Sequence, residues 1–216
     1  MANVTSAFIS DRKGFLETKI VLVPEPQNPG NTGPRIFWFD EAGGVVSLKA
    51  TAPGGTDKTT VNAYWLSWKS KNSTVLDVGN EADYFFTSQM TGCRFKVLTA
   101  GGKNPKVAHI AGDLSPSQRQ KAEDKLLEPI EESARATGTS RRLSVSGSKA
   151  HEYTGQVDNK GQEDQGSAFV FGVKDPDNDW KFQAQIVKAS LADEFKFKQS
   201  LKKGNVPRIA ELFEFN

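Results

Sequence analysis

The chain has 216 residues, and its 28 Lys and Arg nearly balance its 26 Asp and Glu, so the formal charge of +2 argues against a broad surface for nucleic acid or anionic membranes. A single cysteine excludes an internal disulfide framework and a Cys-rich zinc site, and it fits a reducing compartment. Because the N-terminus lacks the apolar core of a secretory signal peptide and no stretch approaches the roughly 18 apolar residues of a membrane span, we expect a soluble protein, folded as one domain over residues 1–216.

Short apolar segments broken by Gly, Pro and Asn dominate the first hundred residues and predict β-strands. These segments are residues 19–26, 35–40, 45–50 and 61–68. The glycine-containing turn EAGG joins the second segment to the third, so residues 35–50 are predicted to form a β-hairpin.

The segment 113–138 changes period and predicts a helix. Ser115 is placed to cap this helix, and Pro116 suits its first position. Pro129 would remove a hydrogen bond inside the helix, so we expect a kink or a division into two shorter helices. The apolar face of the predicted helix consists of Ala122, Leu126, Leu127, Ile130 and Ala134.

Residues 139–166 are polar and glycine-rich, which predicts an exposed, flexible segment with one weak strand. Strands are predicted again at 167–174 and at 179–187, where apolar and polar residues alternate. The C-terminal RIAELFEF alternates in a way that fits either a helix or a strand. Together these elements predict an α+β fold dominated by packed sheets.

The only cysteine and one of the two histidines fall on what reads as a single hairpin. Cys93 lies on one face of the first predicted strand, and His109 lies on the matching face of the next. If residues 100–102 form the turn, facing residues have numbers that sum to 202 and Cys93 lies opposite His109, with Cβ atoms about 4.5 to 5.5 Å apart. A register error of two residues would leave a diagonal pair about 7 to 8 Å apart. Pro105 cannot donate to the ladder and indicates an edge strand or a longer loop.

A thiol beside an imidazole is the arrangement of a cysteine nucleophile. An ordinary thiol, with a pKa of about 8.5, is only a few per cent thiolate at neutral pH, and a neighbouring imidazolium would lower the pKa of Cys93 by several units. Gly92 would allow close approach of a substrate, and the backbone N–H of Cys93 would stabilise a developing oxyanion. Thr87 is the candidate third residue, which would fix the tautomer of His109, although a backbone carbonyl could serve as well.

These residues resemble the core of the Burkholderia lethal factor-like toxins, which are glutamine deamidases. Thr91 and Met90 stand where that family has Ser and Leu, and the interval from Cys93 to His109 is longer. The similar segments are FFTSQMTGC (85–93), the following Gly-Gly pair, VAHI (107–110), RIFWFDEAGGVVSLKA (35–50) and YWLSWK (64–69).

Two further groups resemble this core in their Gly-Cys and His residues, namely the catalytic domains of cytotoxic necrotizing factors and the chemoreceptor glutamine deamidases. The latter also have a threonine six residues before the cysteine, as Thr87 stands before Cys93. By this resemblance the fold would be a β-sandwich of two mixed sheets flanked by helices, as in cytotoxic necrotizing factor.

The resemblance also implies a reaction. Cys93 would attack a glutamine carboxamide of a protein substrate, His109 would protonate the departing ammonia, and water would hydrolyse the thioester to glutamate. No metal and no cofactor would be required. The chain would be a monomeric toxin or effector that acts in the cytoplasm of a target cell.

Two alternatives remain open at this point. The same thioester could be resolved by an amine, which gives transglutamination, or the scissile amide could be a peptide bond. In a different class, the chain would be a non-catalytic β-sandwich binding module, in which Cys93 and His109 are packing residues and the exposed segment 139–167 contacts a protein partner.

Overall fold

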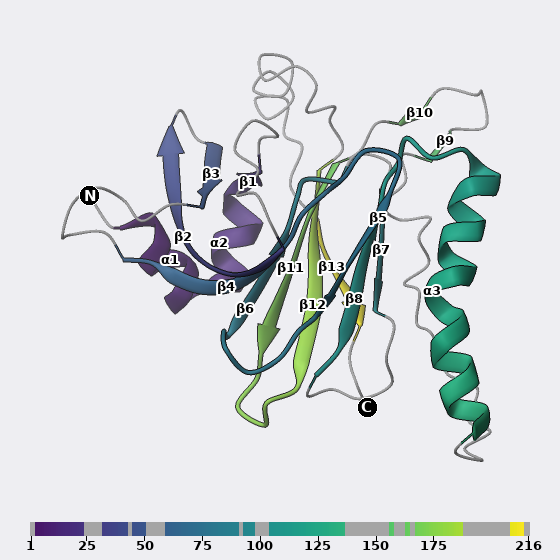
Figure 1. Cartoon of the computed structure of the whole chain (residues 1–216). Coiled ribbons are helices and arrows are strands. Elements are labelled where there is room, and N and C mark those ends of the chain that lie inside the picture. Colours follow the sequence, from purple (N-terminus) through teal and green to yellow (C-terminus); the bar gives the residue numbers. More distant parts are fainter. Residues whose placement is uncertain are drawn as a thin grey trace.

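The chain folds mostly into β-sheet with a few helices, as seen in a computed structural model (Figure 1). This confirms the predicted α+β class and the dominance of sheets. The structure describes residues 3–23, 32–42, 45–50, 59–90, 93–97, 104–136, 156–157, 163–164, 167–187 and 208–213.

The described elements form one large sheet, one small sheet, a short strand pair and helices. The helices are α1 (Val4–Ser10), α2 (Arg12–Thr18) and α3 (Pro116–Ala136). The large sheet is mixed and eight-stranded, in the order β1 (Ile20–Leu22), β3 (Val45–Lys49), β2 (Gly33–Ala42), β4 (Val61–Leu66), β6 (Tyr84–Thr87), β11 (Ser167–Lys174), β12 (Trp180–Val187) and β13 (Arg208–Phe213). The small sheet is three-stranded and antiparallel, in the order β5 (Ser73–Asp77), β8 (Lys106–Ile110) and β7 (Arg94–Val97). The separate pair consists of β9 (Gln156–Val157) and β10 (Glu163–Asp164).

Most predicted strands are confirmed. The predicted hairpin forms from β2 and β3, which pair antiparallel with Asp40 opposite Ser47, while its turn at residues 43–44 lies outside the described residues. The C-terminal segment, whose type the pattern left open, forms strand β13 and pairs with β12. Of the first predicted segment only β1 is observed as a strand, and residues 24–31 lie outside the described part.

Helices α1 and α2, which precede the first strand, were not predicted. Asn3 caps α1 by accepting hydrogen bonds from the backbone N–H groups of Thr5 and Ser6, and Asp11 caps α2 by accepting one from Gly14. Each helix has seven residues, which is too short for a clear apolar period. The two capping side chains were therefore the main sequence signal.

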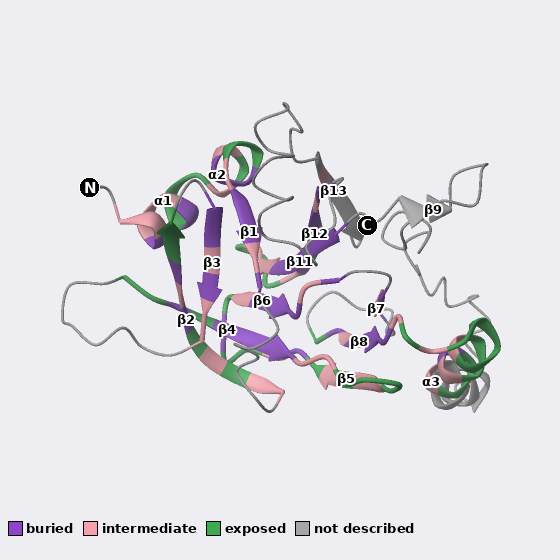
Figure 2. Cartoon of the chain, turned by 90° about the horizontal axis from the view of Figure 1, so that it is seen from above, coloured by how far each residue is buried: buried purple, intermediate pink, exposed green. Residues whose placement is uncertain are grey.

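The eight-stranded sheet curls until its β1 edge approaches β12, so that the sheet nearly closes (Figure 2). Two glutamine side chains bridge the gap at this edge. Each accepts a hydrogen bond from a backbone N–H group, one within β1 and one in the residue that follows β1. The Oε1 atom of Gln185 accepts from the Val21 N–H at 2.9 Å, and that of Gln89 accepts from the Val23 N–H at 3.0 Å. Side-chain amides thus satisfy backbone donors that would otherwise be buried without a partner.

Aromatic side chains join the layers. Phe95 of the small sheet packs against Phe85 and Phe182 of the large sheet, with ring centroids 5.6 Å and 5.5 Å apart. In the region bounded by α1, Phe8 packs against Phe39 at 4.6 Å. The alternating apolar residues of the strands therefore form cores on both faces of the large sheet, and one of these faces meets the small sheet.

Helix α3 begins as predicted. Pro116 is its first residue, the Ser115 hydroxyl accepts from the Gln118 N–H at 3.3 Å, and the Gln118 side chain accepts from the Ser115 N–H at 3.0 Å. This reciprocal pair is a capping box. The expected division at Pro129 is wrong, because the helix continues to Ala136 as one element. Proline removes a single helix hydrogen bond, and a helix of 21 residues tolerates that loss.

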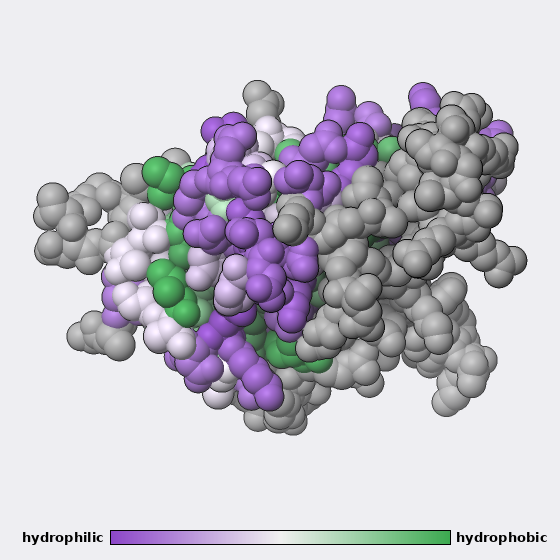
Figure 3. Space-filling view, turned by 90° about the horizontal axis from the view of Figure 1, so that it is seen from below, coloured by the Kyte–Doolittle hydropathy of each residue, from purple (hydrophilic) through white to green (hydrophobic). Residues whose placement is uncertain are grey.

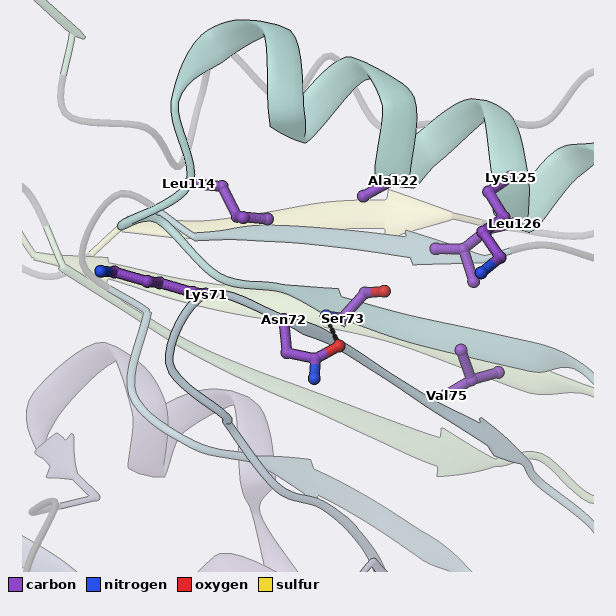
Figure 4. A pocket seen from close by; sticks show the side chains of 8 residues that line it. All are labelled: Lys71, Asn72, Ser73, Val75, Leu114, Ala122, Lys125 and Leu126. Carbon is purple, nitrogen blue, oxygen red and sulfur yellow. Dashed lines mark hydrogen bonds between the residues drawn. The ribbon is translucent and has the colours of Figure 1, made fainter.

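A groove of about 420 Å³ lies between α3 and the edge strand β5 (Figure 4). Ala122 and Leu126 face it, so part of the predicted apolar face of the helix points toward the small sheet. The side chains of Leu127, Ile130 and Ala134 lie outside the described residues. The groove is lined by Lys71, Asn72, Ser73, Val75, Leu114, Ala122, Lys125 and Leu126.

The surface seen from below is mostly hydrophilic over the described residues, with hydrophobic areas that are small and separate (Figure 3). The large hydrophobic side chains that are exposed in the described part are Ile9, Ile36 and Val75, each on a different element. Singly exposed apolar residues are normal in globular proteins. Among the described residues, no helix is long and apolar enough to cross a membrane.

We expect Gln185→Met to lower the free energy of unfolding by about 3 kcal/mol, measured by urea denaturation. The variant keeps the side-chain volume but removes three hydrogen bonds to buried or partly buried backbone groups, because Gln185 accepts from the Val21 N–H and also donates to the carbonyls of Leu16 at 2.6 Å and Lys19 at 2.5 Å. Gln183→Met is the matched control, since Gln183 lies on the same strand and makes no side-chain hydrogen bond within the described part. Equal losses in both variants would contradict the proposed closure.

Candidate active site

The three candidate catalytic residues come from different elements, and two of them, Thr87 and His109, meet between the two sheets. Thr87 is the last residue of β6 in the large sheet, His109 lies on β8 in the middle of the small sheet, and Cys93 directly precedes β7. All three are buried, with 0 %, 1 % and 5 % of their surfaces exposed, respectively. The packing of the sheets therefore brings Thr87 into contact with His109, while Cys93 lies diagonal to His109 along the small sheet.

The Thr87 hydroxyl determines which ring nitrogen of His109 carries the hydrogen in the neutral imidazole. Thr87 Oγ1 lies 2.7 Å from the Leu66 carbonyl oxygen and 2.8 Å from His109 Nδ1. A hydroxyl has only one hydrogen to donate, and the carbonyl can only accept, so that hydrogen goes to Leu66. Thr87 must then accept a hydrogen bond from Nδ1–H. In the neutral ring, the lone pair is consequently on Nε2.

The Nε2 atom of His109 is buried and has no hydrogen-bond partner among the described residues. Burial lowers the pKa of His109 from 6.5 to about 4, because the charged ring would lose its hydration. The ring is thus neutral at pH 7. The expectation that an imidazolium activates Cys93 is wrong for the resting protein, and the imidazole is instead placed to accept a proton.

The predicted register of the hairpin is also wrong by two residues. Phe95, not Cys93, lies opposite His109, so paired residue numbers sum to 204 instead of 202. The connection is longer than the assumed turn at residues 100–102, since β7 ends at Val97 and β8 begins only after Pro105, which has no N–H to donate. Cys93 lies one step beyond the ladder and is diagonal to His109, on the same inner face.

The sulfur of Cys93 accepts a hydrogen bond from the backbone N–H of Gly112, with an N–S distance of 3.3 Å. This contact was not predicted, although the Gly-Asp pair after VAHI is a turn signal that places a backbone N–H near the strand end. Cys93 otherwise belongs to an apolar cluster that includes Phe95 and Val107. Gly92 lies outside the described residues, so its role, like that of the Cys93 N–H as an oxyanion donor, stays a prediction.

A thiolate at this site needs stabilisation beyond the histidine. Moving a proton from an ordinary thiol, with a pKa of about 8.5, to a base with a pKa of about 4 is unfavourable by roughly 6 kcal/mol. Attraction between the two new charges recovers part of this cost in a buried site. The N–H of Gly112 is positioned to supply a further part, because a hydrogen bond to the charged form of a group favours that form.

We expect the protein to lose about 3 kcal/mol of stability through His109 as the pH falls from about 6.5 to about 4. The sign follows from the lowered pKa: between these values the unfolded histidine binds a proton and the folded one does not, so stability is fully present above the range and falls with pH. Urea denaturation at several pH values should show that His109→Gln flattens this dependence, whereas His151→Gln, at the other histidine, leaves it unchanged. A His109 pKa near 6.5 in an NMR titration would contradict the assignment.

Comparison with known proteins gives no information about the function of this site. The chain matches no protein-family model, and no curated protein matches it. The contacts of Thr87, Cys93 and His109 and the resemblance in sequence are therefore the grounds for a function.

Proposed function

We propose that the chain is a cysteine-dependent glutamine deamidase that acts on a protein substrate. The observation that carries this proposal is the hydrogen bond from His109 Nδ1–H to Thr87, which leaves a basic Nε2 atom on the inner face that also holds Cys93. A base with a defined tautomer next to a thiol is the arrangement required for cysteine nucleophiles. It requires no metal and no cofactor.

The reaction follows from these groups. The Cys93 S–H bond breaks, its proton moves to Nε2, and the sulfur forms a bond to the carboxamide carbon. The C–N bond then breaks, and ammonia leaves with the proton from Nε2. Water, deprotonated by the same nitrogen, attacks the thioester, and the C–S bond breaks to give glutamate and the free thiol.

The proposal includes a specific type of fold within the α+β class. The contacts of Phe95 with Phe85 and Phe182 support two sheets packed face to face, as in a β-sandwich of the cytotoxic necrotizing factor type. The resemblance around Cys93 supports a monomeric toxin or effector that modifies a target protein in another cell's cytoplasm. An amine in place of water would give transglutamination, and a backbone amide in place of the carboxamide would give proteolysis.

A second candidate is a non-catalytic binding module. The observation that favours it is the burial of His109 and Cys93, since histidines and cysteines in an apolar core are often packing residues. In such a module, substitution of Cys93 would leave the affinity for the partner protein unchanged.

Deamidation should appear as a mass increase of about 1 Da on specific glutamines when proteins of a cell lysate are incubated with the chain. We expect Cys93→Ser to abolish this change and Thr87→Val to slow it about 10- to 100-fold, because valine cannot accept the Nδ1–H bond. Thr87→Ser is the matched control, since it keeps the hydroxyl, and it should retain most of the activity. Added ethanolamine would mark transglutamination by an amide adduct.

A fully active Cys93→Ser variant would refute the proposed function. If Thr87→Val and Thr87→Ser were equally active, the deamidase assignment would stand, but the role of Thr87 would be refuted. Tandem mass spectrometry of the modified peptides distinguishes these results.

A further inference from the structure

The turn that follows β8 contacts the thiol of Cys93. Its first residue, Gly112, donates its backbone N–H to Cys93 Sγ at 3.3 Å. Ala111, just before the turn, still donates its N–H to the Asn72 carbonyl at 3.0 Å, which extends the pairing of β8 with the chain before β5. The position of this N–H therefore depends on how the turn at residues 112–114 is held.

Helix α3 holds one side of this turn. The Nη2 atom of Arg119 donates to the carbonyl of Gly112 at 2.8 Å and to that of Leu114 at 3.3 Å. The other side is held by the Asp113 carboxylate, which accepts from the Ser70 hydroxyl at 2.7 Å and from the Lys71 N–H at 2.8 Å. The turn thus has an anchor on each side, and of these two anchors Arg119 is the one that binds the carbonyl of the residue that donates to the sulfur.

The same helix also contacts the strand on the other side of Cys93. Glu123, one turn after Arg119, pairs with Arg94, and its second oxygen lies 3.4 Å from Lys96 Nζ. Arg94 directly follows Cys93. Glu123 is buried, so this contact fixes α3 against β7 more firmly than an exposed pair would. One helix therefore contacts both the turn that carries Gly112 and the strand that follows Cys93.

We propose that Arg119 is a positioning residue, which orients the Gly112 N–H so that this group stabilises the Cys93 thiolate. The inference deepens the proposed function, on which it rests, and it assigns α3 a role in the reactivity of the thiol. Charged and titratable groups on the described segments next to Cys93 are Arg94, Lys96, His109, Asp113, Arg119 and Glu123.

The pH dependence of alkylation of Cys93 by iodoacetamide, followed by mass spectrometry, tests this proposal. We expect Arg119→Met to raise the midpoint of the profile by about one pH unit, which slows alkylation about tenfold below the midpoint. Lys121→Met is the matched control, because it removes an exposed positive charge from the same helix, and it should leave the midpoint unchanged. A purely structural role of Arg119 would lower the melting temperature without moving the midpoint, and that result would overturn the proposal.

Gly112→Pro removes the donor itself. Gly112 does not have a positive φ, but the proline ring carbon would point at Cys93 Sγ, so the folded state of this variant is first checked by urea denaturation. We expect this variant to raise the midpoint as Arg119→Met does, whereas Gly112→Ala, which keeps the N–H, should not. An unchanged midpoint in a folded Gly112→Pro variant would overturn the proposal.

The proposed function and the role of Arg119 are refuted by different results. A midpoint near 8.5 in the unmodified protein would mean that Cys93 is not activated, and both the proposed function and this inference would fall. A low midpoint in the unmodified protein that Arg119→Met does not change would leave the deamidase assignment in place and remove only the role of Arg119.

Discussion

The hydrogen bond between Thr87 and His109 joins the two sheets at the point where the chemistry is proposed. It connects the end of β6 in the large sheet to the central strand of the small sheet, and the Leu66 carbonyl next to it forces the direction of the bond. Because the threonine hydrogen is already used, the histidine must donate from Nδ1. Burial then keeps the ring neutral, with its pKa at about 4. The tautomer and the direction of the free lone pair follow from this one contact, and the neutral charge follows from the burial of the ring.

A neutral base changes how the cysteine must be activated. In an ion pair between a thiolate and an imidazolium, most of the stabilisation comes from the opposite charge. Here the resting ring is uncharged, so the thiolate forms only as the proton moves, and neutral donors around the sulfur carry more of the stabilisation. The Gly112 N–H is such a donor, and α3 connects it through Arg119 to the rest of the fold. The surrounding sheets exclude water, which strengthens each of these interactions.

The main strands and the start of α3 could be predicted because alternation, a capping serine and a proline at the first helical position are local signals. Thr87 was proposed because a catalytic imidazole needs a partner that fixes its tautomer, and the resemblance pointed to the same residue, but no local pattern predicts a contact between residues of two different sheets. The register of Cys93 and His109 was missed because it depends on the length of the connection before Pro105. The charge of His109 was missed because burial is a property of the packed structure. Arg119 gave no signal, as its partners are backbone carbonyls.

The proposed deamidase requires Cys93 to be a nucleophile that depends on the neutral imidazole of His109. Its most direct test is the rate of alkylation of Cys93 by iodoacetamide across pH 4 to 10 in the native protein and in His109→Ala. We expect alkylation that is already fast below pH 7 in the native protein, because the neutral imidazole accepts the thiol proton as the sulfur attacks, and a midpoint of about 8.5 or above in the variant, which lacks this base. Slow alkylation with a midpoint near 8.5 in both proteins would contradict the proposed deamidase and would favour the binding module.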